Sequence, residues 1–363
     1  MRIGICTFHY AHNYGAMLQA YALKTFLEGQ DHDVVMVDDR KNNLTSWNPK
    51  PISFLPIKSF LLYPKYLVKW YLPEYLTKRK KEKNFELFLK KYLKNEAFNE
   101  KENVKLDAII YGSDQIWSKF HYGYDEIFFG VQNSNTDRRI AFAASMGMID
   151  IADEEDEKFI REALARFSAI SVREKELQEE LARRGLVSHV EVKIMPDPTF
   201  LLDKSSWIAL NPQRIVKEPY LLFYDFQLDK KTTVIARYIA KEKGLRLIRL
   251  TDGVVSVEKN KNYFVTAGPL EFVSLFYYAD FVVSSSFHGT AFSIINGKQF
   301  YVRQNWNMGR VKTLLESFGL NNRFLKDVEQ VDLNDIIDYQ KVNLIIQRKR
   351  EEQVSFLREA LFG

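Results

Sequence analysis

RIGICTFHYAHNYGAMLQAYALKTFLEGQDHDVVMVDD (residues 2–39) opens the chain and decides its fold class. The apolar run 2–8 predicts a β-strand, and 16–29 predicts a helix, because its apolar residues recur at helical spacing up to a final glycine. A second apolar strand is predicted over 33–39. A strand–helix–strand unit with apolar strands is typical of a parallel sheet that helices cover on both faces.

Strand and helix patterns alternate along the rest of the chain. The polar segment NPQRIVKEP (211–219) holds two prolines and is the best candidate for a linker between two halves. Strands are predicted over 106–112, 139–145, 169–174, 190–202, 220–226, 245–250, 280–285 and 299–303, and helices over 154–167, 232–244, 268–280 and 288–298. We therefore predict an α/β protein of two Rossmann-like domains with a cleft between them. The predicted parts are an N-terminal domain (1–210) with a basic, aromatic helical insertion at about 45–100, a C-terminal domain (211–330) and a long charged C-terminal helix (331–363) that packs back on the body.

The composition is that of a folded protein without disulfides. With 363 residues the chain is long enough for two hydrophobic cores, and 46% hydrophobic with 27% charged residues excludes a disordered chain. Cys6 is the only cysteine, so no internal disulfide can form. The first residues are too polar for a secretory signal, and no run of about 18 apolar residues could span a bilayer. We expect a cytoplasmic protein.

The net charge of +5 is distributed unevenly. Residues 50–94 hold twelve Lys or Arg against three Glu, interleaved with the aromatic run SFLLYPKYLVKWYLPEYL (59–76). Such a segment fits an amphipathic helical insertion with aromatics inward and lysines in water, which we favour, or peripheral contact with the inner face of an anionic membrane. The remaining sequence is nearly balanced in charge and has no nucleic-acid-binding motif, so we expect no nucleic acid.

Polar loops at predicted strand ends are the candidate ligand sites, because ligands of open α/β sheets bind beyond the carboxyl ends of the strands. In HYAHNYGA (9–16), Asn13 and Gly15 allow close approach of a ligand, or Asn13 only caps the helix. In YGSDQIW (111–117), Asp114 and Gln115 suit sugar hydroxyls, or Asp114 is a cap or turn residue. The chain has no GxGxxG at the first loop and no Walker lysine, which excludes a dinucleotide or P-loop site.

Two further loops carry a cation and an imidazole. Arg173 ends a predicted strand and suits an anion clamp, or forms an ion pair with a carboxylate such as Asp197. His288, one of six histidines, follows three serines and precedes Gly289 at a helix start. An imidazole there can donate to an anion or transfer a proton, although most lone histidines are structural.

Taken together, these loops resemble the polysaccharide pyruvyl transferase family over nearly the whole chain. The elements that carry the resemblance are His12-Asn13-Tyr14-Gly15, Gly112-Ser113-Asp114-Gln115-Ile116-Trp117, Val172-Arg173-Glu174, Asp197-Pro198-Thr199 and Ser285-Ser286-Phe287-His288-Gly289. The resemblance implies a fold similar to GT-B glycosyltransferases, with the donor in the interdomain cleft. It also implies phosphoenolpyruvate as donor, a sugar as acceptor and a pyruvate ketal as product.

The resemblance also implies roles for individual residues. His288 matches the family's C-terminal-domain histidine and Arg173 the arginine of its central motif. Family members place an Arg-Leu pair directly before that histidine, where this chain has Ser286-Phe287, so Arg310, Lys312 or Arg303 is expected to replace the missing cation. The resulting prediction has His288 as catalytic residue, Arg173, Ser285, Ser286, Gly289, Arg310 and Lys312 as donor-binding residues, and Asn13, Gly15, Asp114 and Gln115 as substrate-orienting residues.

Ketal formation requires an acid or base of near-neutral pKa and cations around a donor that carries carboxylate and phosphate. His288 would act as the acid/base or donate to the leaving phosphate. No cluster has metal-ligand spacing, so we expect no bound metal and no cofactor, while a divalent ion carried by the phosphate stays open. The expected acceptor is a sugar of a bacterial surface polysaccharide, or a lipid-linked oligosaccharide.

Two other functions stay open. A GT-B glycosyltransferase would use a nucleotide sugar, with Glu271 at the ribose, although Glu271 after Pro269 also fits the first turn of a helix. A catalytically silent, membrane-associated scaffold of polysaccharide assembly would account for the missing arginine and the basic stretch 50–94.

Overall fold

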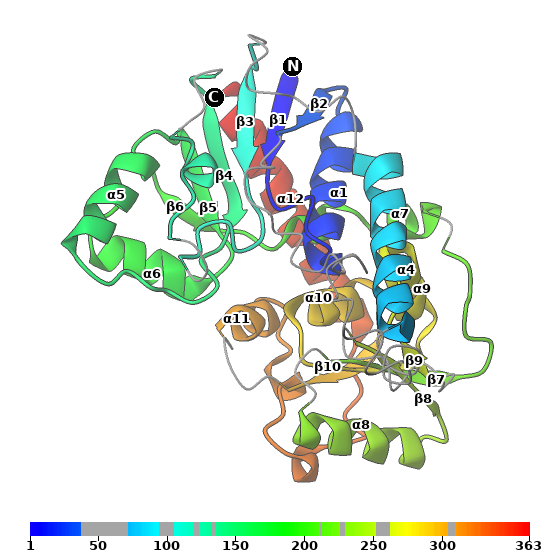
Figure 1. Cartoon of the computed structure of the whole chain (residues 1–363). Helices are drawn as coiled ribbons and strands as arrows, with labels where there is room; N and C mark the ends of the chain where they lie inside the picture. Colours follow the sequence, from blue (N-terminus) through cyan, green and yellow to red (C-terminus); the bar gives the residue numbers. More distant parts are fainter. Residues whose placement is uncertain are drawn as a thin grey trace, which may run out of the picture.

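Two parallel β-sheets, one in each half of the chain, form the frame of the computed structural model (Figure 1). The structure describes residues 1–37, 72–93, 105–119, 123–131, 136–210, 212–225, 229–251, 262–303 and 309–363. The first sheet has the order β2-β1-β3-β4-β5-β6, with β1 Arg2–Cys6, β2 Asp33–Met36, β3 Ala108–Tyr111, β4 Arg139–Ala144, β5 Ala169–Val172 and β6 Val192–Ile194. The second has the order β11-β10-β7-β8-β9, with β7 Tyr220–Tyr224, β8 Arg246–Leu250, β9 Tyr263–Phe264, β10 Phe281–Ser284 and β11 Gln299–Val302.

Each sheet reverses its strand order once. In the first sheet the chain builds outward in both directions from the neighbours β1 and β3, and in the second from β7 and β10. Such a switch point leaves a crevice at the carboxyl ends of the two strands, because their connections leave on opposite sides. The fold therefore offers one crevice in each half.

Helices cover the sheets, and most of them begin at the polar caps that the sequence supplies. Asn13, Asp153, Asp203, Asp229 and Ser286 each accept a backbone N–H at a helix start. The helices are α1 Tyr14–Glu28, α4 Leu72–Phe88, α5 Glu154–Leu164, α6 Lys175–Arg183, α7 Lys204–Ala209, α8 Lys230–Glu242, α9 Pro269–Tyr278, α10 Phe287–Ile295, α11 Gly309–Ser317 and α12 Tyr339–Phe362. Among the described helices, none combines the length and the apolar character that crossing a bilayer requires.

The C-terminal helix returns to the first half. It begins at Tyr339, later than the expected 331, because residues 331–338 form a turn and irregular backbone after the 3₁₀ helix Val328–Gln330. Gln353 Nε2 donates to the carbonyl of Pro196 at 2.9 Å, and Phe356 stacks on Phe142 of β4 at 6.0 Å. Two Rossmann-like domains with a C-terminal helix that crosses back confirm the expected GT-B-like fold class.

The predicted insertion is described only in part, since 38–71 and 94–104 lie outside the described residues. The described part is helix α4 and a following π-helical turn, η3 (Leu89–Leu93). Phe85 and Phe88 are buried, while Lys78, Lys80 and Lys83 are exposed. These two buried aromatic rings and three exposed lysines agree with an amphipathic helical insertion.

The two domains meet at an apolar interface. Tyr14, at the start of α1, stacks on Phe272 of α9 at 4.9 Å and donates its hydroxyl to the carbonyl of Ala267 at 2.8 Å. Trp207 of α7 packs against Phe292 of α10 at 4.9 Å. Residues of both halves thus belong to one buried cluster, and this packing brings the starts of α1 and α10 together.

Candidate functional site

The starts of α1 and α10 touch at Gly15 and His288. A Cβ atom on Gly15 would lie 1.9 Å from His288 Nδ1, so only glycine lets the imidazole approach the helix this closely. His288 is 8% exposed and lies in the first turn of α10, as expected. Because α1 follows β1 and α10 follows β10, the contact joins the switch points of the two sheets.

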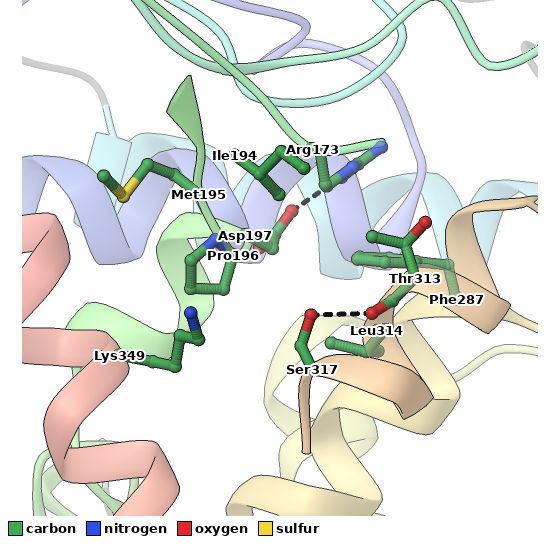
Figure 2. Close-up of a pocket in the computed structure, with 10 residues that line it drawn as sticks. All are labelled: Arg173, Ile194, Met195, Pro196, Asp197, Phe287, Thr313, Leu314, Ser317 and Lys349. Carbon is green, nitrogen blue, oxygen red and sulfur yellow. Dashed lines mark hydrogen bonds and ion pairs between the residues drawn. The ribbon is translucent and has the colours of Figure 1, made fainter. Parts of the chain in front are cut away.

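Asp197 faces His288 from the first domain and lies at the centre of the polar cluster. Its Oδ2 is 3.5 Å from His288 Nε2. The same oxygen lies 2.6 Å from Arg173 Nη1, a contact that Figure 2 shows. Its Oδ1 accepts the backbone N–H of Thr199 at 3.0 Å. The side chain is fully buried. Burial alone would raise the pKa of Asp197, but the contacts with His288 and Arg173 hold it below its usual range. The carboxylate therefore stays charged.

Arg173 is paired rather than open to solvent. The sequence left open an anion clamp or an ion pair with Asp197, and the structure contains the ion pair. The guanidinium also lies 4.3 Å from the centre of the Phe287 ring. Burial alone would lower the pKa of Arg173, but the carboxylates of Asp197, Glu174 and Asp114 raise it. The phenyl ring that replaces the family's leucine thus stacks on the central arginine.

Arg310 is the second cation of the cluster. It is 8% exposed, and burial followed by the charge of Arg173 lowers its pKa to about 10, so it remains protonated at neutral pH. The carboxylates of Glu174, Asp114 and Asp197 act in the opposite direction and raise the pKa of Arg310. Burial raises the pKa of Glu174. Among the three replacements expected for the missing family cation, Arg310 is the one that the structure brings to Arg173.

The other two replacements lie elsewhere. Lys312 is exposed, and its ammonium lies 5.9 Å from the centre of the Phe324 ring. Arg303 pairs with Asp229 at the start of α8 at 2.5 Å. Among the described residues, the partners of Lys312 and Arg303 therefore lie away from Arg173 and His288.

Residues that sequence reasoning missed connect the cluster to the sheet. Ser113 Oγ lies 3.2 Å from Asp197 Oδ2, 3.3 Å from Arg173 Nη1 and 3.0 Å from the carbonyl of Ala143. Gln19 of α1 donates to Thr7 Oγ1 at 2.8 Å and accepts the N–H of Ser113 at 3.2 Å. A buried polar network therefore runs across the carboxyl ends of the first sheet to His288. Gln19 had one sequence signal, an amide within the apolar face of a predicted helix.

The remaining predicted residues make local contacts. Asn13 Oδ1 accepts the N–H of Ala16 at 3.2 Å, which is the capping role that the sequence left open. Asp114 Oδ1 accepts the N–H of Gln115 at 2.8 Å and lies 3.9 Å from Arg173 Nη2. A Cβ on Gly147 would lie 2.1 Å from Gln115 Oε1, so the glutamine side chain packs against that glycine.

The serine side chains before His288 also form hydrogen bonds within the second domain. Ser285 Oγ donates to Asp225 Oδ1 at 2.9 Å, and Ser286 Oγ accepts the N–H of Gly289 at 3.5 Å as the cap of α10. A Cβ on Gly289 would lie 2.1 Å from Ser284 Oγ, so this glycine allows α10 to pack on β10. Asp225 also pairs with Arg249 at 2.8 Å.

Glu271, the candidate ribose ligand, lies in the first turn of α9. Its Oε2 accepts the backbone N–H of Gly268 at 2.9 Å, which caps the helix. The structural interpretation of this residue, a first-turn glutamate after Pro269, is confirmed.

A narrow cavity lies beside the cluster, between the domains. The residues that line it include Arg173, Asp197 and Phe287, together with the end of β6, helix α11 and Lys349 of α12 (Figure 2). The side chains of Arg173 and Asp197 face each other across the top of this cavity (Figure 2). Within the described residues, no group of three or more His, Cys, Asp and Glu side chains could hold a metal ion.

Solved structures with distant similarity include sugar-nucleotide enzymes. A UDP-GlcNAc 2-epimerase from Methanocaldococcus jannaschii is 10% identical over 99% of this chain and 100% of its own, with a TM-score of 0.46. A glycosyltransferase from Rickettsia africae is 10% identical over 99% and 95%, also at 0.46. An uncharacterised protein from Klebsiella pneumoniae is 13% identical over 74% and 98%, at 0.41. No curated protein matches the chain.

The family model of polysaccharide pyruvyl transferases matches residues 13–307. This span covers most of the chain and runs from the loop of Gly15 past the loop of His288. It also contains Ser113, Arg173 and Asp197. The chain belongs to the polysaccharide pyruvyl transferase family.

Proposed function

We propose that this protein transfers a pyruvyl group from phosphoenolpyruvate to a sugar of a bacterial surface polysaccharide or its precursor. The family membership supports transfer to a polysaccharide. The main support for this reaction is the position of His288, which lies between Gly15 and the charged Asp197 where the switch points of the two sheets meet. Buried Arg173 and Arg310 lie in the same cluster.

The reaction needs one proton on carbon and two hydroxyl attacks. A proton adds to the methylene carbon of the donor, and a sugar hydroxyl attacks the adjacent carbon and loses its own proton. The bond from that carbon to the phosphate oxygen breaks, and inorganic phosphate leaves with its electron pair. A second hydroxyl of the same sugar then closes the ketal, and its proton passes to phosphate or solvent.

His288 is the group suited to the proton steps. An imidazole titrates near neutral pH, and a positioned acid of this kind contributes about 10²–10⁴-fold to a rate. Asp197 Oδ2, 3.5 Å from Nε2, fixes the ring orientation from one side, while Gly15 fixes it from the other. Asp197 is thus a positioning residue, and its role is part of the proposal.

Arg310 supplies the positive charge that the family's arginine would provide at the position of Ser286. Arg173 already pairs with Asp197, so its charge is largely used within the protein. Arg310 is buried and protonated, and a guanidinium in such a place binds carboxylate or phosphate oxygens through charge-assisted hydrogen bonds. Donor binding would thus depend on Arg310 together with Arg173.

The experiment that tests the function uses purified protein, phosphoenolpyruvate and a panel of free and lipid-linked sugars. The expected result is release of inorganic phosphate that depends on acceptor, with a mass increase of the acceptor equal to one pyruvyl ketal. His288→Ala should abolish both readouts in a folded protein. No adduct with any acceptor, together with thermal stabilisation by a nucleotide sugar and none by phosphoenolpyruvate, would overturn the proposal in favour of a glycosyltransferase.

A further inference from the structure

Helix α4 exposes apolar and basic side chains together on one face. Leu72, Leu76 and Leu87 are 39%, 57% and 54% exposed. At helical spacing they share one face with Arg79, Lys80 and Lys83, all of which are exposed. We call these six residues, Leu72, Leu76, Arg79, Lys80, Lys83 and Leu87, the outer face of α4.

The opposite face of α4 fixes the helix on the body, so the leucines cannot turn inward. Phe85 and Phe88 are buried against the first domain, and Asn84 Nδ2 donates to the carbonyl of Thr266 at 2.9 Å. Lys81 lies 5.3 Å from the centre of the Tyr14 ring. Figure 1 shows α4 on the outside of α1, away from the sheet, with α9 below it.

The charge around the outer face is predominantly positive. Residues 72–93 hold seven Lys or Arg and three Glu. Glu82 is buried and pairs with Arg79 at 3.0 Å, and Glu86 lies at the edge of the face by helical spacing. Lys90 and Lys91 of η3 extend the basic surface beyond the end of α4. An anionic partner therefore complements this surface.

A shallow groove continues the apolar part of the surface. Leu87, Phe88, Tyr92 and Leu270 line it, with Lys90 and Lys91 among the other lining residues. Glu271 also lines the groove, and it caps its own helix through Gly268. The groove thus joins apolar side chains to two ammonium groups.

We propose that the outer face of α4 docks on an anionic lipid bilayer. Leucines inserted at the level of the headgroups remove apolar surface from water, and lysines beside them meet the lipid phosphates. Exposed leucines alone would fit a protein partner equally well, but their alternation with Lys and Arg favours a charged, deformable lipid surface. This proposal is independent of the chemistry proposed for His288, because no residue of the outer face belongs to the site. It would place the enzyme where lipid-linked acceptors lie.

The test is co-sedimentation of the full-length protein with vesicles of phosphatidylcholine, with and without phosphatidylglycerol. We expect binding only to the vesicles that contain phosphatidylglycerol, and its loss at high salt. Each lysine near an anionic surface contributes about fivefold to binding, so Lys80→Gln/Lys83→Gln should weaken it by about thirtyfold. Leu76→Ser/Leu87→Ser should weaken it by about tenfold, because about half of each side chain is already buried.

The matched controls lie on α8, which lies below the second sheet in Figure 1. Arg237→Gln/Lys241→Gln and Val234→Ser change exposed residues of the same kinds and should leave vesicle binding unchanged. The α4 variants should retain pyruvyl transfer to a soluble acceptor, which separates this test from that of the function. Absence of vesicle binding by the wild type, equal loss in the α8 variants, or a dimer that the leucine variants dissociate would each overturn the proposal.

Discussion

Gly15→Ala is the substitution whose effect the geometry defines most sharply. The added Cβ would lie 1.9 Å from Nδ1, 2.2 Å from Cε1 and 2.4 Å from Cγ of His288. Ordinary van der Waals contacts of a Cβ begin at 3.4 Å. The imidazole must therefore move by more than an ångström, or the start of α1 must retreat. The ring is 8% exposed and has Asp197 on its other side, so it has little room.

Two terms of opposite sign set the change in stability. Overpacking a filled site costs about 1–3 kcal/mol. Alanine in place of glycine within a helix gains up to about 1 kcal/mol. The free energy of unfolding should thus fall by about 0–2 kcal/mol, which leaves the protein folded. Activity should fall much further, because displacing a catalytic group by about 1 Å costs on the order of a hundredfold.

The assay combines urea unfolding with acceptor-dependent phosphate release. Gly29→Ala, at the other end of α1, is the control: the nearest atom to its Cβ is Thr25 O at 3.3 Å, so its activity should match that of the wild type. In a His288→Ala background the clash disappears, and Gly15→Ala should then be neutral or stabilising. The reasoning is refuted if Gly15→Ala keeps activity within about threefold of wild type, or if it costs the same stability in both backgrounds.

Three further results are expected. Arg310→Ala should raise KM for phosphoenolpyruvate by about 10–150-fold, the loss of one charge-assisted contact, whereas Lys312→Ala should leave KM unchanged. The double substitution Ser286→Arg/Phe287→Leu restores the Arg-Leu pair of the family. Added to Arg310→Ala, it should recover part of the lost affinity for phosphoenolpyruvate. If KM is the same with and without the double substitution, Arg310 does not take the place of the family's arginine. Asp197→Asn should lower the free energy of unfolding, measured in urea, by about 3–5 kcal/mol, because it removes the nearest carboxylate from the buried guanidinium of Arg173. The pKa of Asp197 is lower in the folded than in the unfolded protein. The stability that its charge contributes is therefore fully present above the unfolded pKa of about 3.9 and is lost as pH falls towards the folded pKa. The difference in free energy of unfolding between wild type and Asp197→Asn should become smaller in that pH range.

The sequence was sufficient for the order of most strands and for the longer helices between them, while α6, α7 and α11 were not predicted as separate helices. Apolar runs such as AIIY (108–111) are buried in every residue, and periodicity separates them from the amphipathic helices. A two-residue strand, β9, has no such pattern and was not predicted. The late start of α12 was also missed, because a charged segment with scattered apolar residues fits helix and loop alike.

Pairing within the site could be predicted only in part, because the partners are far apart in the sequence. Asp197 was named as a possible partner of Arg173, and the structure contains that ion pair. Nothing in the local sequence shows that the same carboxylate also lies against His288. Ser113 and Gln19 connect helix α1 to the end of β3 across 94 residues. The close approach of Gly15 to His288 depends on how two domains pack, and a glycine at a helix start is compatible with many local structures.

Asp197 shows why residue type alone overstates the positive charge of such a site. Two arginines and a histidine in one predicted crevice suggest a site ready for an anion. In the folded chain, however, one carboxylate lies against Arg173 and against His288, and Asp114 and Glu174 are also near. Because an arginine that pairs with a buried carboxylate cannot bind a donor at full strength, Arg173 alone is a weak donor site. Arg310, which none of the matching motifs contains, is the second buried cation of the cluster, and the KM of its alanine variant is the measurement on which the proposed donor site depends.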